Sequence, residues 1–329
     1  MRFGIIGCGA IASQSFAPSL LNSDHLDLVA ACRRNGIKAK EFAEQFGGCA
    51  AYDSADALLA DRQVEAVIVA TPTDTHAEYT LAAAQAGKHV LCEKPMARSG
   101  AECRLMIEAC KTAGVTLGVA YRRRLFPQVL AAQELIASGR IGRVVCVHTH
   151  YAGWGDLTAD AWRLQPEIGG ALMEMAVHRI EVLLNLAPAL PVDVSGLVET
   201  VEHDWPVDDS DALLLRFADG TIGVHSTIMT SRPRHDYAQI DGTEGRIFID
   251  PLECDVDQIE VEVPEGREVV SLRPLVRPFF DQPMIEDFAQ AAKDGRLPVC
   301  DAETGYRVQA VADAARESAI SGRRINLDL

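Results

Sequence analysis

Two ionisable side chains stand where the sequence can place proton-transfer chemistry. Lys94 follows the short apolar run from His89 to Cys92, and burial at a strand end can lower a lysine pKa enough for proton exchange with a substrate oxygen. His178 follows Glu174 by four residues, a spacing that brings both side chains to one helix face. Because imidazole titrates near neutrality, we expect His178 to carry the proton and Lys94 to polarise the oxygen. The alternatives are an exposed strand-end lysine and a helix histidine that packs against Glu174.

A metal site has weaker support in the sequence. Glu174 and His178 could supply two ligands, but no third ligand stands at a suitable spacing, so we expect no metal. The nine cysteines are scattered, odd in number and without a C-x-x-C pair. This pattern predicts reduced thiols and a cytoplasmic protein rather than a disulfide framework.

A glycine-rich turn near the N-terminus predicts a dinucleotide site. The residues Gly7-Cys8-Gly9-Ala10-Ile11-Ala12 follow a short apolar strand and open a helical pattern, which is the context that the G-x-G-x-x-A fingerprint requires. Gly7 permits the tight turn, Gly9 lets backbone amides approach a pyrophosphate, and Ala12 allows close helix–strand packing. The alternative is a strand–helix turn that binds no ligand.

The residues after the second apolar run predict which nicotinamide dinucleotide binds. About 20 residues beyond the fingerprint, an acidic residue would bind the ribose 2′-hydroxyl of NAD, but this chain has Arg33 and Arg34 there. A guanidinium would pair with the 2′-phosphate of NADP through charge-assisted hydrogen bonds. We therefore expect NADP(H), with NAD(H) as the alternative if both arginines are only solvated loop charges.

Short apolar runs alternate with helical segments over residues 1–120. The runs cover 3–6, 28–32, 66–70, 89–92 and 115–120, and the helical segments cover 10–21, 38–46, 75–86 and 101–113. This alternation with short turns predicts an α/β domain with a doubly wound, mostly parallel sheet. Lys94 then lies at the carboxyl edge of the sheet, where such sheets bind ligands.

Residues 121–329 follow a different pattern. Helical segments at 126–138 and 170–185 flank a strand at 144–150, strands follow at 212–217, 222–227, 237–240, 246–249 and 259–263, and helices at 284–293 and 302–321 come last. Turn signals such as Ala218-Asp219-Gly220-Thr221 separate the strands. The grouping predicts an α+β second domain around a mainly antiparallel sheet.

Composition and charge exclude several classes of protein. Lys and Arg total 31 against 47 Asp and Glu, a net charge of −16, which argues against nucleic acid and anionic membranes as partners. No apolar run approaches the ~18 residues of a membrane span, and we expect no signal peptide. Hydrophobic residues at 48% and charged residues at 24% are ordinary values for a folded chain.

Four ordered motifs resemble the Gfo/Idh/MocA oxidoreductases, the family of glucose–fructose oxidoreductase and inositol dehydrogenase. They are the turn 7–12, Thr71-Pro72-Thr73-Asp74-Thr75-His76, Glu93-Lys94-Pro95, and the stretch from Trp162-Arg163 through Gly169-Gly170-Ala171 to His178. The resemblance covers essentially the whole chain. It implies a Rossmann domain, a second domain whose open sheet supports a homodimer or homotetramer, and hydride transfer between a nicotinamide and a hydroxyl or carbonyl carbon.

The resemblance also implies roles for individual residues. Lys94, often before a cis proline bond, becomes a catalytic or substrate-orienting residue, and His178 an acid or base. Glu174 stands where the family usually has Asp, and its extra methylene displaces the carboxylate. Around the cofactor the resemblance places Thr71, Pro72, Thr73, His76, Glu93, Lys94 and Arg122, and around the substrate Lys94, Trp162, Arg163, Glu174 and His178. His76 is equally compatible with a helix histidine that contacts no ligand.

These observations lead to one principal expectation. The chain is expected to be an NADP(H)-dependent oxidoreductase that acts on a sugar, polyol or related hydroxy or carbonyl compound. One alternative is an NADP-dependent reductase of a non-sugar ring compound. The other is a dinucleotide-binding regulatory protein that no longer catalyses, for which the unusual Glu174 leaves room.

Overall fold

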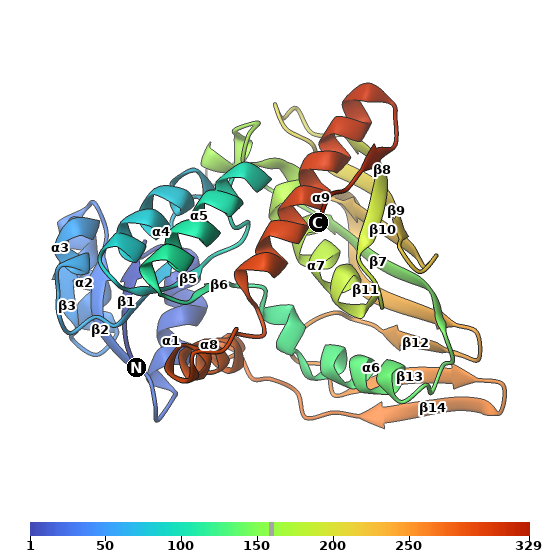
Figure 1. The fold of residues 1–329 in the computed structure, drawn as a ribbon, viewed down its shortest axis with the longest axis horizontal. Coiled ribbons are helices and arrows are strands. Elements are labelled where there is room, and N and C mark those ends of the chain that lie inside the picture. Colours follow the sequence, from blue (N-terminus) through green and yellow to red (C-terminus); the bar gives the residue numbers. More distant parts are fainter. Residues whose placement is uncertain (158–160) are drawn as a thin grey trace. The chain divides into compact units, whose positions relative to one another are not determined.

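The computed structural model describes residues 1–157 and 161–329 and divides the chain into two compact units (Figure 1). The first unit contains Met1–Arg122 and Val276–Tyr306, and the second contains Arg123–Leu275 and Arg307–Leu329. The sequence patterns placed a single boundary at residue 120 and assigned everything beyond it to the second domain. The units differ from that division because 276–306 packs with the first unit.

Helix α8 (Gln282–Asp294) joins the first unit through its apolar face. Phe288 is fully buried, and its ring centroid lies 6.2 Å from that of Phe3 in the first strand. The same ring fills the space beside Gly118, where an added Cβ would come within 2.9 Å of it. Such contacts between residues far apart in the chain leave no local pattern in the sequence, so the return of the chain could not be predicted.

The first unit is built on a six-stranded parallel sheet in the order β3-β2-β1-β4-β5-β6. The strand order reverses between β1 and β4, the switch point where Rossmann sheets bind ligands beyond the strand ends. All four residues of β4 are buried, as a strand covered on both faces requires. The doubly wound parallel sheet is therefore confirmed. Its strands are β1 (Arg2–Ile6), β2 (Asp27–Cys32), β3 (Ala50–Tyr52), β4 (Ala66–Val69), β5 (His89–Cys92) and β6 (Leu117–Val119).

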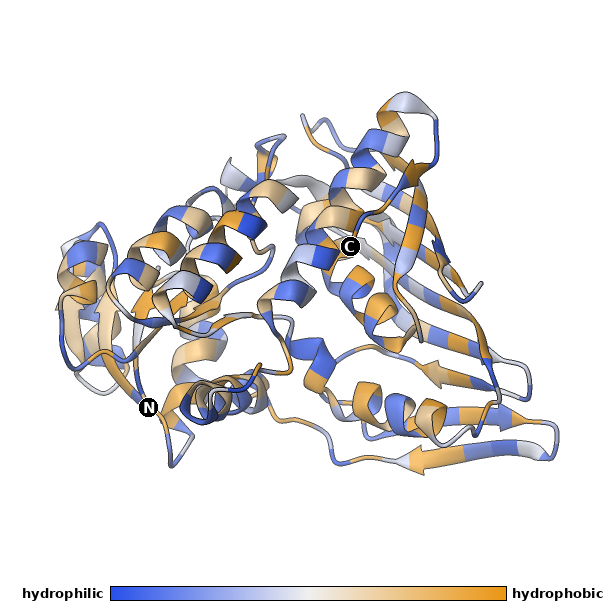
Figure 2. Cartoon of the chain, in the orientation of Figure 1, coloured by the Kyte–Doolittle hydropathy of each residue, from blue (hydrophilic) through white to orange (hydrophobic). Residues whose placement is uncertain are grey.

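Helices connect these strands, and the first of them is irregular. A π-helical turn, η1 (Ala12–Phe16), precedes α1 (Ala17–Leu21) where a uniform helix over 10–21 was expected. Figure 2 shows apolar and hydrophilic residues side by side along the helices, as surface helices that cover a sheet require. The other elements are α2 (Gly36–Gln45), α3 (Ala55–Leu59), η2 (Thr73–Thr75), α4 (His76–Gln85), α5 (Gly100–Ala113) and η3 (Arg122–Leu125).

The second unit contains a nine-stranded sheet in the order β14-β13-β12-β11-β7-β10-β9-β8-β15. Strand β10 pairs with β7 in parallel, and the other described pairs are antiparallel. The mainly antiparallel second sheet is thus confirmed. Its strands are β7 (Val144–Trp154), β8 (Pro191–Glu199), β9 (Ser210–Phe217), β10 (Ile222–Ile228), β11 (Thr230–Gly242), β12 (Arg246–Ile249), β13 (Gln258–Val263), β14 (Gly266–Ser271) and β15 (Ile325–Asn326).

The two faces of the large sheet differ in burial. Helix α7 (Val177–Leu186) packs against β7 and β10 on one face, where Val147 and Thr149 are fully buried. On the other face His148 and His150 are only partly buried. The remaining helices are α6 (Pro127–Ala137), η4 (Ala161–Leu164), η5 (Leu172–Ala176) and α9 (Ala302–Ser321).

Candidate functional site

The turn after β1 forms a cradle at the start of the first helix. Gly7 has a φ of +103°, and a Cβ there would lie 2.5 Å from the Ala70 carbonyl oxygen, so the turn requires glycine. The Cβ position of Gly9 has nothing within 4 Å. This open space beside the start of a helix fits the pyrophosphate of a dinucleotide. Of the other fingerprint residues, Cys8 and Ala12 are buried, Ile11 is partly buried and Ala10 is exposed.

Arg33 reaches this cradle from the end of β2. Its Nη1 donates a hydrogen bond of 2.9 Å to the Cys8 carbonyl, and its backbone amide donates to the Tyr52 carbonyl at 3.1 Å. Arg33 is partly buried, whereas Arg34 is exposed. The guanidinium is therefore fixed against the fingerprint turn, and a positive charge stands beside the cradle.

His76 joins the loops that follow β4 and β5. Its Nδ1 lies 2.8 Å from the Pro95 carbonyl oxygen and its Nε2 lies 2.9 Å from the Thr71 carbonyl oxygen. The ring is 1% exposed, and burial lowers the pKa of His76, which favours the neutral imidazole. A neutral imidazole donates to only one of these two main-chain oxygens, and the buried ring contacts both loops from within the protein.

The loop after β4 carries the other residues expected near the cofactor. Thr71 and Pro72 are partly buried, and Thr75 Oγ1 lies 2.8 Å from both Thr71 Oγ1 and the Pro72 carbonyl oxygen. Thr73 is only 1% exposed. Thr71 and Pro72 are therefore more exposed than Thr73, although we expected all three to lie near the cofactor.

Glu93 and Lys94 form the turn after β5, at the carboxyl edge of the sheet as expected. The Lys94–Pro95 peptide bond is cis, and the Lys94 amide donates a hydrogen bond of 2.7 Å to Glu93 Oε2. Glu93 is 6% exposed, and its burial raises its pKa, although the positive charges of Lys94 and Arg122 oppose that rise. Lys94 is partly buried. A buried carboxylate and two cations are therefore gathered at this turn.

In the second unit, the helix that carries Glu174 and His178 begins irregularly. The turn η5 is π-helical, so the regular α-helix expected over 170–185 is wrong in its first turn. A π-turn bonds to the fifth residue rather than the fourth, and such turns are frequent at functional sites. The Leu172 amide donates a hydrogen bond of 2.7 Å to Asp208 Oδ2. Asp208 thus fixes the start of the helix.

Arg316 of α9 holds the loop before this helix. Its Nη2 lies 3.2 Å from the Gly169 carbonyl oxygen, and its Nη1 lies 3.3 Å from that of Glu167. Burial raises the pKa of Asp208, and the Arg316 charge opposes that rise. The sequence analysis missed both Asp208 and Arg316. The adjacent acids Asp208 and Asp209, placed before a strand, were the one local signal.

Glu174 pairs with a cation from η4. Arg163 Nε lies 3.6 Å from Glu174 Oε2, and Arg163 Cζ lies 5.2 Å from the centroid of the Trp162 ring. Glu174 and His178 are each 6% exposed. The structure therefore brings together Trp162, Arg163 and Glu174, with His178 on the same helix as Glu174.

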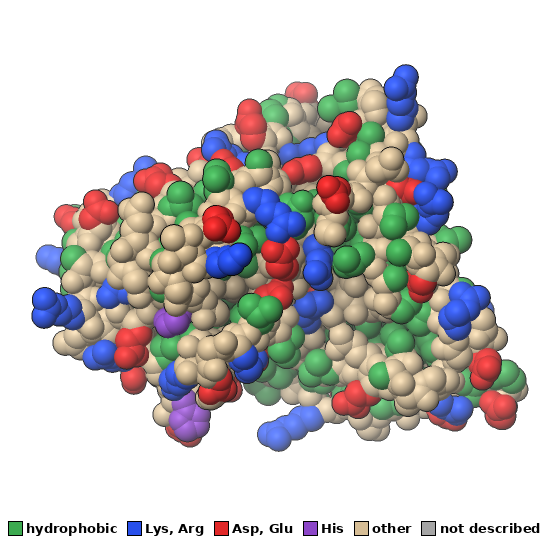
Figure 3. Space-filling view, in the orientation of Figure 1, with side chains coloured by type: hydrophobic (Ala, Val, Ile, Leu, Met, Phe, Trp, Pro, Cys, Tyr) green, Lys and Arg blue, Asp and Glu red, His purple; other side chains and the backbone are tan. Residues whose placement is uncertain are grey.

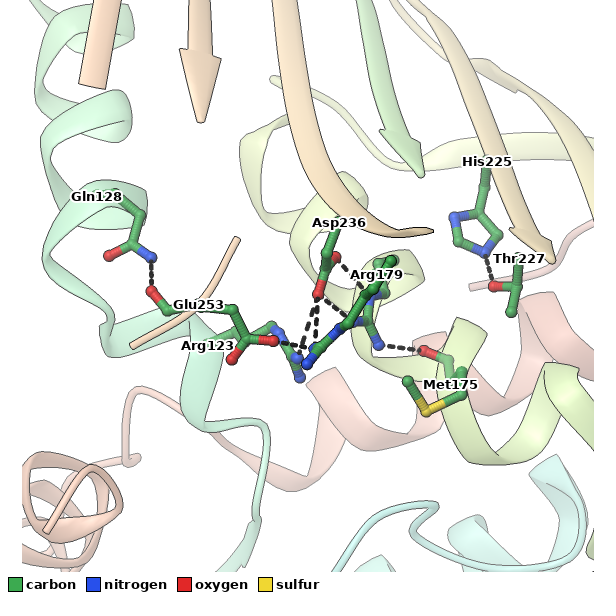
Figure 4. A network of polar contacts seen from close by, with 9 residues as sticks. Arg123, Gln128, Met175, Arg179, His225, Thr227, Asp236 and Glu253 are labelled. Carbon is green, nitrogen blue, oxygen red and sulfur yellow. Dashed lines mark hydrogen bonds and ion pairs between the residues drawn. The ribbon is translucent and has the colours of Figure 1, made fainter. Parts of the chain in front are cut away.

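A network of buried charges lies beside this helix (Figure 4). Arg179 is fully buried; its Nε donates a hydrogen bond of 3.0 Å to Asp236 Oδ1 and its Nη1 donates one of 3.0 Å to the Met175 carbonyl. Arg123 Nη2 lies 3.8 Å from Asp236 Oδ2. Because Met175 belongs to the π-turn, Arg179 anchors that turn to strand β11.

His225 lies buried on β10 and contacts two hydroxyl groups, one of which, that of Thr227, is drawn in Figure 4. Its Nδ1 lies 2.9 Å from Thr149 Oγ1, and its Nε2 lies 2.9 Å from Thr227 Oγ1 and 3.4 Å from Asp211 Oδ1. Burial lowers the pKa of His225 to about 3 and raises that of Asp211. Burial therefore favours the neutral form of both groups.

Strand β7 sends its aromatic side chains to opposite faces, which the sequence could not assign. Tyr151 is buried, and Arg179 Cζ lies 4.5 Å from its ring centroid. His150 points to the opposite face, where its Nδ1 lies 2.7 Å from Ser226 Oγ. Trp154 is 47% exposed. The strand extends to Trp154, beyond the end expected at 150, because β11 pairs with it that far.

On the face in Figure 3, acidic and basic side chains are interspersed. Among the described residues, no group of three or more His, Cys, Asp or Glu side chains is placed to hold a metal ion. Within residues 1–157 and 161–329, no helix has both the length and the apolarity to cross a membrane.

The chain matches known proteins along its length. Residues 1–121 match the model "Oxidoreductase family, NAD-binding Rossmann fold", and 129–248 match the GFO/IDH/MocA C-terminal domain. The chain is 32% identical over 334 residues to D-xylose 1-dehydrogenase (NADP(+)) 2 of Haloferax volcanii, covering 100% of both chains. The aldose-aldose oxidoreductase from Caulobacter crescentus, complexed with glycerol, has a TM-score of 0.91 at 27% identity over 99% of each chain. Levoglucosan dehydrogenase in complex with NADH and levoglucosan has a TM-score of 0.89 at 26% identity over 100% of each chain. The chain therefore belongs to the GFO/IDH/MocA family of NAD(P)-dependent oxidoreductases.

Proposed function

We propose that this enzyme transfers hydride between NADP(H) and a hydroxyl or carbonyl carbon of a sugar, polyol or related small molecule. The observation that carries this proposal is the full-length similarity to a D-xylose dehydrogenase named for NADP(+). Relatives named for aldoses and levoglucosan support the sugar class. The presence of Lys94 and His178 supports catalysis over a purely regulatory role.

The preference for NADP(H) rests on Arg33. Its hydrogen bond to the Cys8 carbonyl holds a guanidinium against the fingerprint turn, and no acidic residue stands at 31–35 to repel a phosphate. A 2′-phosphate would therefore meet a positive charge whose position is already fixed. Arg34 is exposed on the same loop and adds a second, less ordered charge.

The bound dinucleotide supplies the hydride acceptor or donor, and the chain supplies position and proton management. Gly7, Gly9 and the Thr71–Pro72 loop hold the cofactor. His178 exchanges the proton with the substrate oxygen, and Lys94 stabilises negative charge on that oxygen. Glu174, paired with Arg163, orients the substrate hydroxyls. Trp162 offers an aromatic face to a sugar ring.

A cofactor titration combined with a substrate panel tests this function. NADPH and NADH are titrated by fluorescence, and NADP(+) reduction is followed by absorbance with D-xylose, levoglucosan, myo-inositol and trans-dihydrobenzenediol. We expect NADPH to bind more tightly than NADH, and at least one sugar or polyol to be oxidised. Turnover of the dihydrodiol alone would replace the sugar proposal with the ring-compound alternative, and cofactor binding without any turnover would favour the regulatory one.

We also propose that the large sheet pairs two or more copies of the chain. Leu197, Leu214 and Ile222 lie on adjacent strands and are 63%, 57% and 51% exposed, so an apolar area faces outward. A second copy laid on this face would bury it, giving a homodimer or, with a further interface, a homotetramer. Sedimentation equilibrium should give a multiple of 35.6 kDa, and Leu214→Arg should lower that mass. A wild-type monomer at micromolar concentration would contradict the proposal.

The cysteines support a reducing compartment such as the cytoplasm. None of the nine is in a disulfide bond, and seven of them are buried. Burial raises the pKa of Cys8 and of Cys110 to about 12, so both remain protonated and unreactive. Titration of the denatured chain with a thiol reagent should count nine thiols, and a lower number would reveal oxidation.

A further inference from the structure

The segment that returns to the first unit carries a buried carboxylate that no motif assigned. Asp281 is 0% exposed and occupies the N-cap position of α8. A side chain at this position usually accepts a hydrogen bond from its own helix, but Asp281 makes no such bond. Its carboxylate is therefore available to other elements of the unit, at the energetic cost of being buried.

Asp281 contacts two other segments of the first unit: the helix that follows the fingerprint turn, and Arg122, which follows the last strand of the parallel sheet. Ser15, in the π-turn η1, donates a hydrogen bond from Oγ to Asp281 Oδ2. Arg122 Nη1 lies 3.5 Å from Asp281 Oδ1, and Arg122 Cζ lies 4.7 Å from the Phe280 ring centroid. One carboxylate thus links the segment that forms the cradle to the cation at the end of the first unit.

The charges continue from Asp281 to the turn after β5. The Arg122 and Lys94 cations lower the pKa of Glu93, whereas the Asp281 carboxylate raises it. From Asp281 through Arg122 and Glu93 to Lys94, the side-chain charge therefore alternates between negative and positive. These groups are close enough to influence the charge state of one another. If Asp281 were replaced by a neutral residue, Arg122 would lose its buried partner, and the charges around Glu93, whose Oε2 accepts a hydrogen bond from the Lys94 amide, would change.

We propose that Asp281 is a positioning residue for the hydride-transfer reaction, which fixes Arg122 and through it the Glu93–Lys94 turn. The proposal rests on the proposed function, because it assigns Lys94 a role in catalysis. Asp281 itself contacts Ser15 and Arg122 rather than the reacting groups. Its loss should therefore lower turnover more than it weakens cofactor binding.

The test compares Asp281→Asn with Asp294→Asn, which removes the same charge from an exposed position at the other end of α8. With the panel sugar that the wild type oxidises fastest, we expect Asp281→Asn to lower kcat about tenfold or more, since a small misplacement of catalytic groups is costly. The KM for NADP(+) should change less than about threefold, because the cradle residues remain. Asp294→Asn should match the wild type in both constants.

A double-mutant cycle separates positioning from a merely structural role. Arg122→Gln should cause a loss similar to that of Asp281→Asn, and the double variant should lose no more than either alone. Additive losses, or an Asp281→Asn kcat within about twofold of the wild type, would overturn the proposal. If Asp281→Asn does not fold, Ser15→Ala is used in its place. We expect a smaller loss of kcat from Ser15→Ala, and its additivity with Arg122→Gln is tested in the same way.

The proposed function can fail independently of this inference. If the wild type oxidises no panel sugar, the sugar proposal is wrong, and the emission spectrum of bound NADPH then tests the positioning role. Asp281→Asn and Arg122→Gln should change that spectrum alike, while Asp294→Asn leaves it unchanged. Wild-type spectra in both variants would overturn the role of Asp281.

Discussion

The candidate cofactor site of the first unit is built mainly from backbone, whereas the candidate substrate site of the second unit is built mainly from charged side chains. Gly7 and Gly9 shape the cradle, Arg33 bonds to a main-chain carbonyl, and His76 contacts two more. In the second unit, Arg163 pairs with Glu174 and Arg179 with Asp236. A backbone site depends on few side chains, whereas a site of paired side chains depends on the charges that those side chains carry.

The largest expected effect is the loss of turnover when a proton-handling group is removed. His178→Ala and Lys94→Ala should each lower kcat by ~10²–10⁴-fold, the range of a lost acid–base or charge-stabilising group. Cofactor affinity, measured by NADPH fluorescence, should fall less than kcat does, because Gly7, Gly9 and Arg33 remain at the cradle. His235→Ala, an exposed histidine on β11, is the control. If His178→Ala keeps near wild-type turnover across about pH 6 to 9, His178 is not the proton carrier, and Lys94 or Tyr151 must carry the proton instead.

The second effect concerns Arg33, to which we assign the proposed preference for NADP(H). Arg33→Ala should weaken NADPH binding by about 1–3 kcal/mol, the value of charge-assisted hydrogen bonds. NADH lacks the 2′-phosphate, so its affinity should change little. Arg34→Ala, which removes the exposed neighbour, should cost less. Equal wild-type affinities for NADPH and NADH at physiological salt would contradict the assignment.

Substitutions at Gly7 and Gly9 separate the effect of the cradle on stability from its effect on cofactor binding. Gly9→Ala should leave stability unchanged, because its Cβ meets nothing within 4 Å, but should weaken NADPH binding about tenfold by filling the pyrophosphate space. Gly7→Ala should lower the free energy of unfolding by more than about 1–2 kcal/mol, because its φ of +103° disfavours a side chain and its Cβ would lie 2.5 Å from the Ala70 carbonyl oxygen. Thermal unfolding and cofactor titration of both variants measure the difference. Wild-type affinity of Gly9→Ala for NADPH would show that the pyrophosphate does not bind beside Gly9.

The last expected effect concerns stability rather than binding or catalysis, and it is the acid sensitivity of the second unit. The folded chain keeps His225 neutral down to about pH 3, whereas its ordinary pKa is 6.5. At His225 the unfolded state therefore binds more protons between those values, and the stability that this residue contributes falls as pH drops through them by up to ~1.4 kcal/mol per pH unit. The raised pKa of Asp211 acts in the opposite direction, but it does so in both proteins of the comparison that follows. Urea unfolding of the wild type and His225→Gln should show a difference that shrinks with acid. A constant difference across the window would contradict the pKa assignment.

The comparison also explains how much of the fold was predictable. Apolar runs and glycine punctuation predicted five of the six strands of the first sheet, because each run is local and buried on both faces. The edge strand β3 has three residues and α3 has five, too few for a period to appear. The return of 276–306 depends on Phe288 meeting Phe3, a contact with no local signature.

The candidate sites divide in the same way. The fingerprint turn was visible because its backbone geometry requires glycine at a fixed place after a strand. Arg33 was predicted from its distance beyond that turn and from its charge, and its role stays a prediction. The spacing of Glu174 and His178 was visible, but the π-turn η5 was not, because no residue type specifies it. Asp208 and Arg316 support that helix from 36 and 147 residues away in the chain. Partners so distant are selected by the tertiary fold.

The measurement that tests the account most directly is isotope transfer. The panel sugar that is oxidised fastest is deuterated at its reacting carbon and incubated with the wild-type enzyme and NADP(+). We predict that mass spectrometry will find the deuterium on the nicotinamide ring of NADPH, because hydride passes directly from the sugar carbon to the cofactor. Deuterium released to water, or unlabelled NADPH formed from the labelled sugar, would contradict the account.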